Sequence, residues 1–123
     1  MHKQSFLHSL GNAFNGLFSF FKTERNGKKQ LIIGLLVIGA SFFFRISSIE
    51  WVAILLCIAL VISLEMINSA LEKLSDLVEP NYNLVIKSVK DISAAAVLWS
   101  AIISVIIACI IFIPKLWTCS NNC

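Results

Sequence analysis

Two long apolar runs without a charged residue constrain this chain more than any other feature. The first extends from Trp51 to Leu64 and the second from Ile92 to Ile113. A helix needs about 20 apolar residues to cross a hydrocarbon core about 30 Å thick. Together with a hydrophobic content of 58% and a mean hydropathy of +0.85, these runs exclude an ordinary soluble protein. We therefore predict an all-α membrane protein that forms a single domain over residues 1–123.

We predict three membrane spans, preceded by a helix on the membrane surface. The spans lie at about residues 31–49, 49–71 and 92–113. The first span is the weakest, because its apolar run ends at Phe44 and reaches spanning length only if Arg45 extends its side chain to the far interface. Residues 5–22 carry apolar side chains at helical spacing, which is typical of an amphipathic helix at the bilayer surface. Residues 22–30 are predicted to form a polar hinge between this helix and the first span.

The positive charges predict the orientation of the spans. Lys3, Lys22, Arg25, Lys28 and Lys29 precede the first span, and Lys73, Lys87 and Lys90 lie between the second and the third. The opposite boundary carries Arg45 and Lys115. Because lysine and arginine concentrate on the cytoplasmic side, the N-terminus and the loop at Pro80 are predicted inside and the C-terminus outside. No basic run is interleaved with stacking aromatic residues, so nucleic acid is not an expected partner.

Polar side chains line one face at the inner end of the second span. Glu65, Asn68, Glu72 and Asp76 follow one another at spacings that keep them within about 80° on a helix. Such carboxylates can simply mark the end of a membrane helix. However, like charges one helical turn apart repel each other, and a divalent cation between them would remove that cost. Carboxylate oxygens suit magnesium, which proteins commonly hold with one or two carboxylates plus substrate phosphates.

Other segments bring charged residues to the same boundary. Glu24 precedes the first span, and Lys90 and Asp91 precede the third. A local ion pair with Arg25 or Lys28 would explain Glu24, but this carboxylate could also share a metal with Glu72. Carboxylates for magnesium, a cation for phosphates and a base near a hydroxyl are the groups that phosphoryl transfer needs. At this boundary they would meet cytosolic ATP and a membrane lipid alcohol at once.

The segment E-M-I-N-S-A-L-E-K-L-S-D, residues 65–76, resembles the signature E-x-x-N-[ST]-A-[IL]-E-x-x-x-D of the small prokaryotic diacylglycerol kinase and undecaprenol kinase family. The similarity continues in A-F-N-G-L-F-S-F-F-K-T-E-R-N upstream and V-K-D-I-S-A-A-A-V-L downstream. This resemblance implies an ATP-dependent lipid kinase in the bacterial cytoplasmic membrane, with its active site at the cytoplasmic face. It also implies a homotrimer of three-span subunits whose active sites form between neighbouring protomers. Diacylglycerol is the expected substrate, with undecaprenol as the alternative in the same family.

The resemblance further implies a role for individual residues. Glu65 matches the proposed general base for the lipid hydroxyl, and Glu24 and Glu72 match the two carboxylates that hold Mg²⁺. The nucleotide-binding positions are Glu24, Glu72, Asn12, Asn81, Tyr82, Asn83, Lys90 and Asp91; the lipid-binding positions are Glu65, Asn68 and Ala94; and Asp76 supports the site. The loop at residues 81–83 keeps only the tyrosine of the Glu-Tyr-His that is common in the family. Asn12 and Ala94 also differ from the residues expected there.

Two other classes of protein fit the sequence less well. A small proton-coupled transporter would place its membrane glutamate near the bilayer midplane, whereas Glu65 comes about 24 Å along the helix from Ile49. A non-catalytic assembly subunit would give no reason for Glu24, Glu72 and Lys90 to face one compartment. We therefore expect a lipid kinase.

Overall fold

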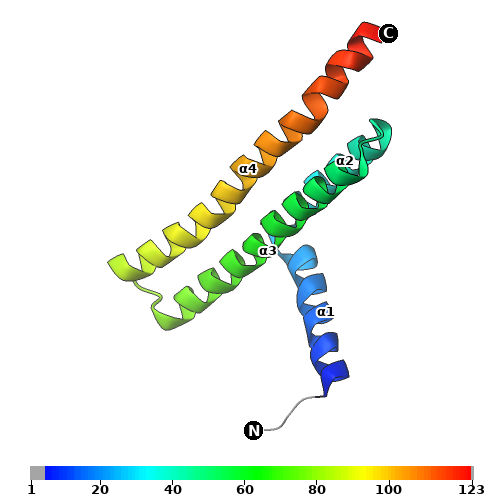
Figure 1. Cartoon of the computed structure of the whole chain (residues 1–123). Helices are drawn as coiled ribbons and strands as arrows, with labels where there is room; N and C mark the ends of the chain where they lie inside the picture. The colour runs from blue at the N-terminus through cyan, green and yellow to red at the C-terminus, as the bar shows by residue number, and fades with distance from the viewer. Residues whose placement is uncertain (1–4, 123) are drawn as a thin grey trace.

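The computed structural model describes residues 5–122, which form four helices and, within that range, no strand. The helices are α1 (Phe6–Thr23), α2 (Arg25–Phe43), α3 (Ser48–Val78) and α4 (Leu84–Asn122). Helix α3 runs antiparallel to both α2 and α4, which share one direction, and α1 leaves this bundle at a steep angle (Figure 1). The all-α prediction is confirmed. Lys3 and Cys123 lie outside the described residues.

Local sequence explains where α3 begins and ends. The Ser47 hydroxyl accepts the Glu50 N–H at 3.3 Å, and the Glu50 carboxylate accepts the Ser47 N–H at 2.9 Å. This reciprocal capping box satisfies two amide groups that a helix start would otherwise leave unpaired. At the other end Glu79 leaves the helical conformation, because a residue that precedes proline is disfavoured there. The predicted stop at Glu79 and Pro80 is confirmed.

Helix α2 differs from the predicted first span at both ends. The span was expected to continue to residue 49, but α2 ends at Phe43. Arg45 then adopts a φ of 50°, in the left-handed region, so it cannot continue the helix. The polar hinge predicted over residues 22–30 is also wrong, because Arg25–Gln30 form the first turns of α2. Arginine, lysine and glutamine are good helix formers, and Glu24 alone separates α1 from α2.

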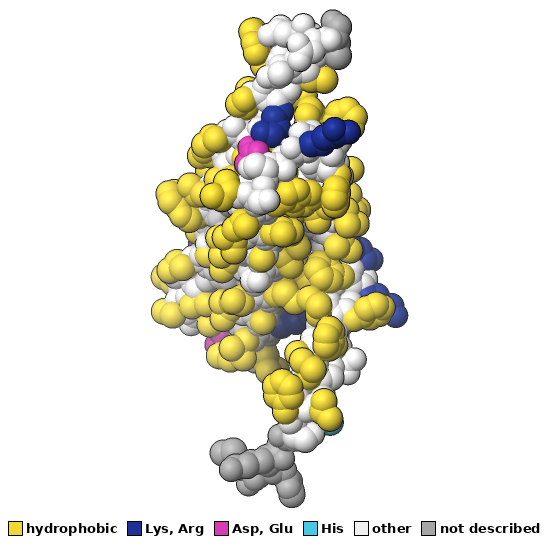
Figure 2. Space-filling model, turned by 45° about the vertical axis from the view of Figure 1, so that its right-hand side comes forward, with side chains coloured by type: hydrophobic (Ala, Val, Ile, Leu, Met, Phe, Trp, Pro, Cys, Tyr) yellow, Lys and Arg dark blue, Asp and Glu magenta, His cyan; other side chains and the backbone are white. Residues whose placement is uncertain are grey.

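Among the described residues, α3 and α4 are the two helices that are long and apolar enough to cross a membrane. Helix α2 falls short because its first turns carry cationic side chains and its apolar run begins at Leu31. In their most apolar stretches, only 28% of α3 and 11% of α4 is buried within the chain. Figure 2 shows hydrophobic side chains over the middle of the visible face, with charged side chains above and below this band. A surface of this kind needs hydrocarbon or another apolar surface to cover it.

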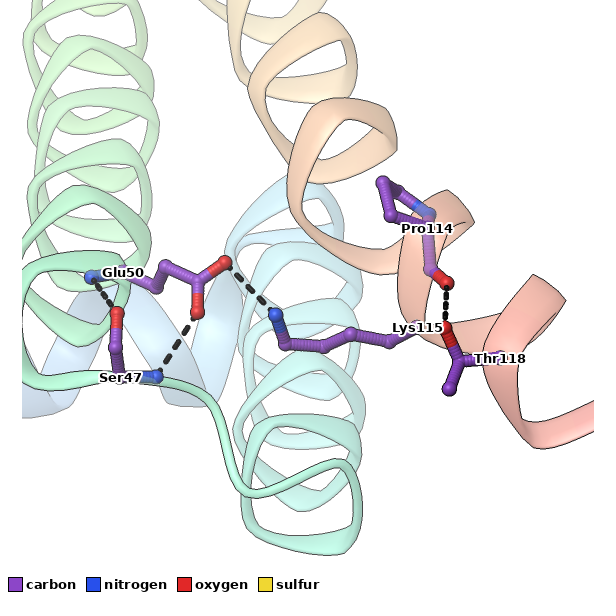
Figure 3. A network of polar contacts seen from close by, with 5 residues as sticks. All are labelled: Ser47, Glu50, Pro114, Lys115 and Thr118. Atoms are coloured by element: carbon purple, nitrogen blue, oxygen red, sulfur yellow. Dashed lines mark hydrogen bonds and ion pairs between the residues drawn. The ribbon is translucent and has the colours of Figure 1, made fainter. Parts of the chain in front are cut away.

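An ion pair closes the end of the bundle that lies away from the α3–α4 loop. Lys115 Nζ of α4 donates to Glu50 Oε2 of α3 at 2.9 Å (Figure 3). Because Glu50 Oε1 accepts the Ser47 N–H, one carboxylate both caps α3 and holds α4. Thr118 donates its hydroxyl to the Pro114 carbonyl at 3.0 Å, one turn beyond the proline inside α4. The buried apolar residues at this end are Ile46, Ile54 and Ile111.

Helix α1 meets α2 at a tight elbow around Glu24. Glu24 caps the end of α1, where its N–H donates to the Phe20 carbonyl at 3.0 Å, and it is also the cap residue at the start of α2. Gly27 packs directly against this turn. A Cβ atom on Gly27 would lie 2.8 Å from the Phe20 carbonyl oxygen and 2.9 Å from the Phe20 ring. The elbow therefore requires a residue without a side chain at position 27.

We expect Gly27→Ala to destabilise the protein. Overpacking costs about 1–3 kcal/mol, which exceeds the gain of at most about 1 kcal/mol that alanine has over glycine inside a helix. Gly39→Ala is the matched control, because a Cβ on Gly39 of the same helix meets nothing within 4 Å. Thermal unfolding of both variants in one detergent checks this prediction. An unfolding temperature for Gly27→Ala equal to that of Gly39→Ala would contradict it.

Candidate active site

Glu65 is a buried carboxylate on α3. The residue is 6% exposed, and its Oε2 finds no hydrogen-bond partner within residues 5–122. Asn26 and Gln30 approach the carboxylate from α2. Glu72, two turns further along α3, carries a like charge that repels it. A buried carboxylate oxygen that lacks a donor is costly. Glu65 therefore presents an acceptor that a hydroxyl group could satisfy.

Asn68 connects α3 to α4 next to this carboxylate. Its Nδ2 donates to Glu72 Oε1 at 3.4 Å, and its Oδ1 accepts the Ser93 hydroxyl of α4 at 2.7 Å. Asn68 and Ser93 are buried, whereas Glu72 is exposed. The predicted polar face of α3 is thus present, and it changes from buried at Glu65 to open at Glu72.

Lys90 and Asp91, which were both predicted to bind the nucleotide, take part in separate ion pairs. Lys90 Nζ lies 2.5 Å from Asp76 Oδ1 of α3, and Lys87 Nζ lies 2.6 Å from Asp91 Oδ2 within α4. All four side chains are substantially exposed. Exposed ion pairs contribute about 0–1 kcal/mol, so an anionic ligand can replace either contact at little cost.

Glu24 pairs with a residue from α3. Lys73 Nζ lies 2.7 Å from Glu24 Oε1, so the partner is neither Arg25 nor Lys28. Both side chains line a cleft of about 400 Å³ between α1 and α3. Because Lys73 directly follows Glu72, this contact brings the elbow at Glu24 to the same turn of α3. Glu24 therefore lies beside the stretch of α3 that carries Glu65, Asn68 and Glu72.

Two of the predicted loop residues make contacts that organise the loop and the start of α4. The Asn83 side chain accepts the N–H groups of Val85 and Ile86 at 2.9 and 3.2 Å, and so caps the start of α4. The Asn81 N–H donates to the Glu79 carboxylate at 3.2 Å. Tyr82 is 79% exposed. Outside the loop, Asn12 on α1 and Ala94 on α4 are both exposed.

Sequence reasoning missed four residues that contact the predicted ones: Asn26, Gln30, Lys73 and Ser93. The four-residue spacing of Asn26 and Gln30 was a usable signal, since it places both on one side of a helix. That signal was lost because this segment was interpreted as a hinge. For Ser93 the sequence offered no means of choosing it over its neighbour Ala94.

Glu24 and Glu72 carry carboxylate oxygens, the kind of ligand that magnesium prefers. Within residues 5–122, no cluster of three or more His, Cys, Asp and Glu side chains is placed to bind a metal ion. Magnesium needs no such cluster when substrate phosphates supply the remaining ligands. The donor set therefore suits a magnesium ion that arrives with a nucleotide.

Comparison with known proteins assigns the family. The family model for prokaryotic diacylglycerol kinase matches residues 11–112. The chain is 37% identical over 111 residues to the undecaprenol kinase of Bacillus subtilis (strain 168), which covers 90% of each protein. It is 35% identical over 111 residues to a diacylglycerol kinase of Synechocystis sp., which covers 89% of this chain and 63% of that relative. The chain therefore belongs to the prokaryotic diacylglycerol kinase family and is a membrane lipid kinase.

Proposed function

We propose that this protein transfers the γ-phosphate of ATP to the hydroxyl group of a membrane lipid alcohol. The first candidate substrate is diacylglycerol, which would give phosphatidic acid, and the second is undecaprenol. The observation that carries this proposal is the buried Glu65, whose Oε2 lacks a donor within the described residues. The chain is similar to a kinase of each type, which supports both lipids as candidate substrates.

Glu65 is proposed as the general base. Its Oε2 would accept the proton of the lipid hydroxyl while the lipid oxygen forms a bond to the γ-phosphorus and the bond from that phosphorus to the ADP oxygen breaks. The approach of Asn26 and Gln30 from α2 would hold the carboxylate in place. A correctly placed base typically contributes about 10²- to 10⁴-fold to the rate.

Glu24 and Glu72 are proposed to hold Mg²⁺ together with the phosphates of ATP. The ion would neutralise the charge on these phosphates during transfer. Lys90 and Asp91 would contact the nucleotide once their ion pairs with Asp76 and Lys87 open, and Lys73 would release Glu24 in the same way. The remaining proposed nucleotide contacts are Asn12, Asn81, Tyr82 and Asn83.

We propose a homotrimer in the bacterial cytoplasmic membrane, with the active site at the cytoplasmic face. Most of the apolar surface of α3 and α4 is not buried within the chain, which supports both a location in the membrane and contact with further subunits. Helix α1 is proposed to lie on the membrane surface, since Phe6, Phe14 and Phe18 are 78%, 62% and 71% exposed.

Transfer of radiolabel from γ-labelled ATP into purified lipids tests the proposed reaction. Diacylglycerol and undecaprenol, each presented in the same detergent micelles, should differ clearly in their kcat/KM values. A higher value for undecaprenol would select the second candidate. The absence of transfer to either lipid would overturn the proposed function.

Labelling of cysteines tests the proposed orientation. A thiol reagent that cannot cross membranes should label the tail cysteines, Cys119 and Cys123, from outside, because the asymmetry of positive charge predicts the tail there. It should spare Cys57 and Cys109, which lie in two of the predicted spans. The control is Leu77→Cys in a background without the two tail cysteines, since Leu77 is 81% exposed near the α3–α4 loop. It should react from the cytoplasmic side alone. Tail labelling from the cytoplasmic side would reverse the orientation and separate the site from cytosolic ATP.

A further inference from the structure

We infer that Ser93 is a positioning residue for the carboxylate of Glu72, and that it acts through the side-chain amide of Asn68. The inference rests on the proposed function in one respect, which is that Glu72 holds the magnesium ion of MgATP. Ser93 itself touches neither the nucleotide nor the metal in this scheme. Its hydroxyl instead determines which way the neighbouring amide faces.

A chain of hydrogen bonds runs from α4 to the carboxylate on α3. The Ser93 hydroxyl donates to Asn68 Oδ1 at 2.7 Å, and Asn68 Nδ2 donates to Glu72 Oε1 at 3.4 Å. Ser93 is 9% exposed and Asn68 is 6% exposed. Water therefore has little access to replace either end of the amide, and the protein must supply its partners.

The chemistry of the three groups gives this chain its direction. An ionised carboxylate only accepts hydrogen bonds, so the amide must turn its NH₂ group toward Glu72. The amide oxygen then faces α4, where it needs a donor. A serine hydroxyl can donate, and Ser93 does so at the shorter of the two distances. Without this hydroxyl the buried oxygen would lack a donor from α4, and the amide would lose the contact that holds its NH₂ group toward Glu72.

Neighbouring residues of α4 show that this role is specific to position 93. Ala94 is exposed and carries no polar group. Ser100 is buried like Ser93, but its hydroxyl donates to the Val97 carbonyl of the same helix at 2.8 Å. Ser100→Ala therefore removes another buried hydroxyl from α4 without touching the active site, and it is the matched control.

The test measures metal binding apart from catalysis. Binding of Mn²⁺ is followed by electron paramagnetic resonance in the presence of a non-hydrolysable ATP analogue, using the purified full-length protein in detergent. Ser93→Ala should weaken Mn²⁺ binding by about threefold to tenfold, the ratio expected for one lost hydrogen bond. Ser100→Ala should bind as the unchanged protein does. Ser93→Thr, which keeps the hydroxyl, should lie closer to the unchanged protein than to Ser93→Ala.

The same variants are then compared for lipid phosphorylation at increasing Mg²⁺ concentration. Ser93→Ala should need about threefold to tenfold more Mg²⁺ for its half-maximal rate. If Ser93→Ala does not fold, Ser93→Cys takes its place, because the thiol fills the space that alanine leaves and is only a weak donor. Equal metal binding by the Ser93 and Ser100 variants would overturn the inference. If the unchanged protein binds Mn²⁺ with the analogue but phosphorylates neither lipid, the proposed function fails while the binding comparison still decides the role of Ser93.

Discussion

Glu65→Gln is expected to lower lipid phosphorylation by at least about 100-fold and to leave the protein folded. The amide has nearly the same size as the carboxylate, but it cannot accept the proton that the lipid hydroxyl loses, and that role is typically worth about 10²- to 10⁴-fold. The change also removes a potential charge from a site that is 6% exposed. Because an unpaired buried charge is costly, the unfolding temperature should not decrease.

Turnover at saturating ATP and lipid, together with thermal unfolding, checks this expectation. Glu79→Gln is the control, because Glu79 lies just beyond the end of α3 and its carboxylate accepts only the nearby Asn81 N–H in the described structure. That variant should retain normal turnover. If Glu65→Gln kept more than about a tenth of the normal rate, Glu65 could not be the base.

Glu24→Gln and Glu72→Gln are each expected to raise the Mg²⁺ concentration for half-maximal activity by at least about tenfold. Residues that hydrogen-bond directly to a metal ligand typically change metal affinity by about 10- to 100-fold, and these carboxylates are proposed to bind the ion themselves. The double variant should lose little more activity than the worse single variant, because the effects of residues that act as a unit are strongly non-additive. Lipid phosphorylation measured against Mg²⁺ concentration for all three variants decides this. If the losses of activity in the two single variants added up in the double variant, Glu24 and Glu72 would not share a metal ion.

The ion pair between Lys73 and Glu24 supplies a competing explanation for the first of these changes. Glu24→Gln breaks that pair as well as removing a possible metal ligand. Lys73→Met breaks the pair alone and leaves the carboxylate in place. If Glu24 acts through the metal, Lys73→Met should keep a nearly normal Mg²⁺ requirement. A requirement matching that of Glu24→Gln would instead assign Glu24 a purely structural role.

The polar face of α3 could be predicted from sequence because it depends on periodicity within one helix. The spacing of Glu65, Asn68 and Glu72 requires only that the segment be helical, and Pro80 marks where the helix must stop. The role of Asn83 was also within reach, since asparagine is a preferred cap at a helix start. It was instead assigned to the nucleotide by resemblance, a role that stays a prediction.

Contacts between helices could not be predicted in the same way. Lys73 is far from Glu24 in sequence, and their contact depends on the direction in which α1 and α2 leave the elbow. Ser93 and Ala94 are adjacent, and the rotation of α4 about its axis decides which one faces α3. The first span was predicted too long because hydropathy does not report backbone conformation. The left-handed conformation of Arg45, which prevents the helix from continuing, was therefore not foreseen.

The elbow at Glu24 also restricts how the length of this chain can change. Glu24 ends α1 and begins α2, so no linker exists there to absorb an inserted residue. One extra helical residue would turn α1 by about 100° about its own axis. Phe14 and Phe18 would then face a different direction relative to α2 and α3. Residues 79–83 between α3 and α4 lie outside any helix and can take up an insertion without rotating either helix. The arrangement of the helices should therefore survive an insertion in the α3–α4 loop but not one at the α1–α2 junction.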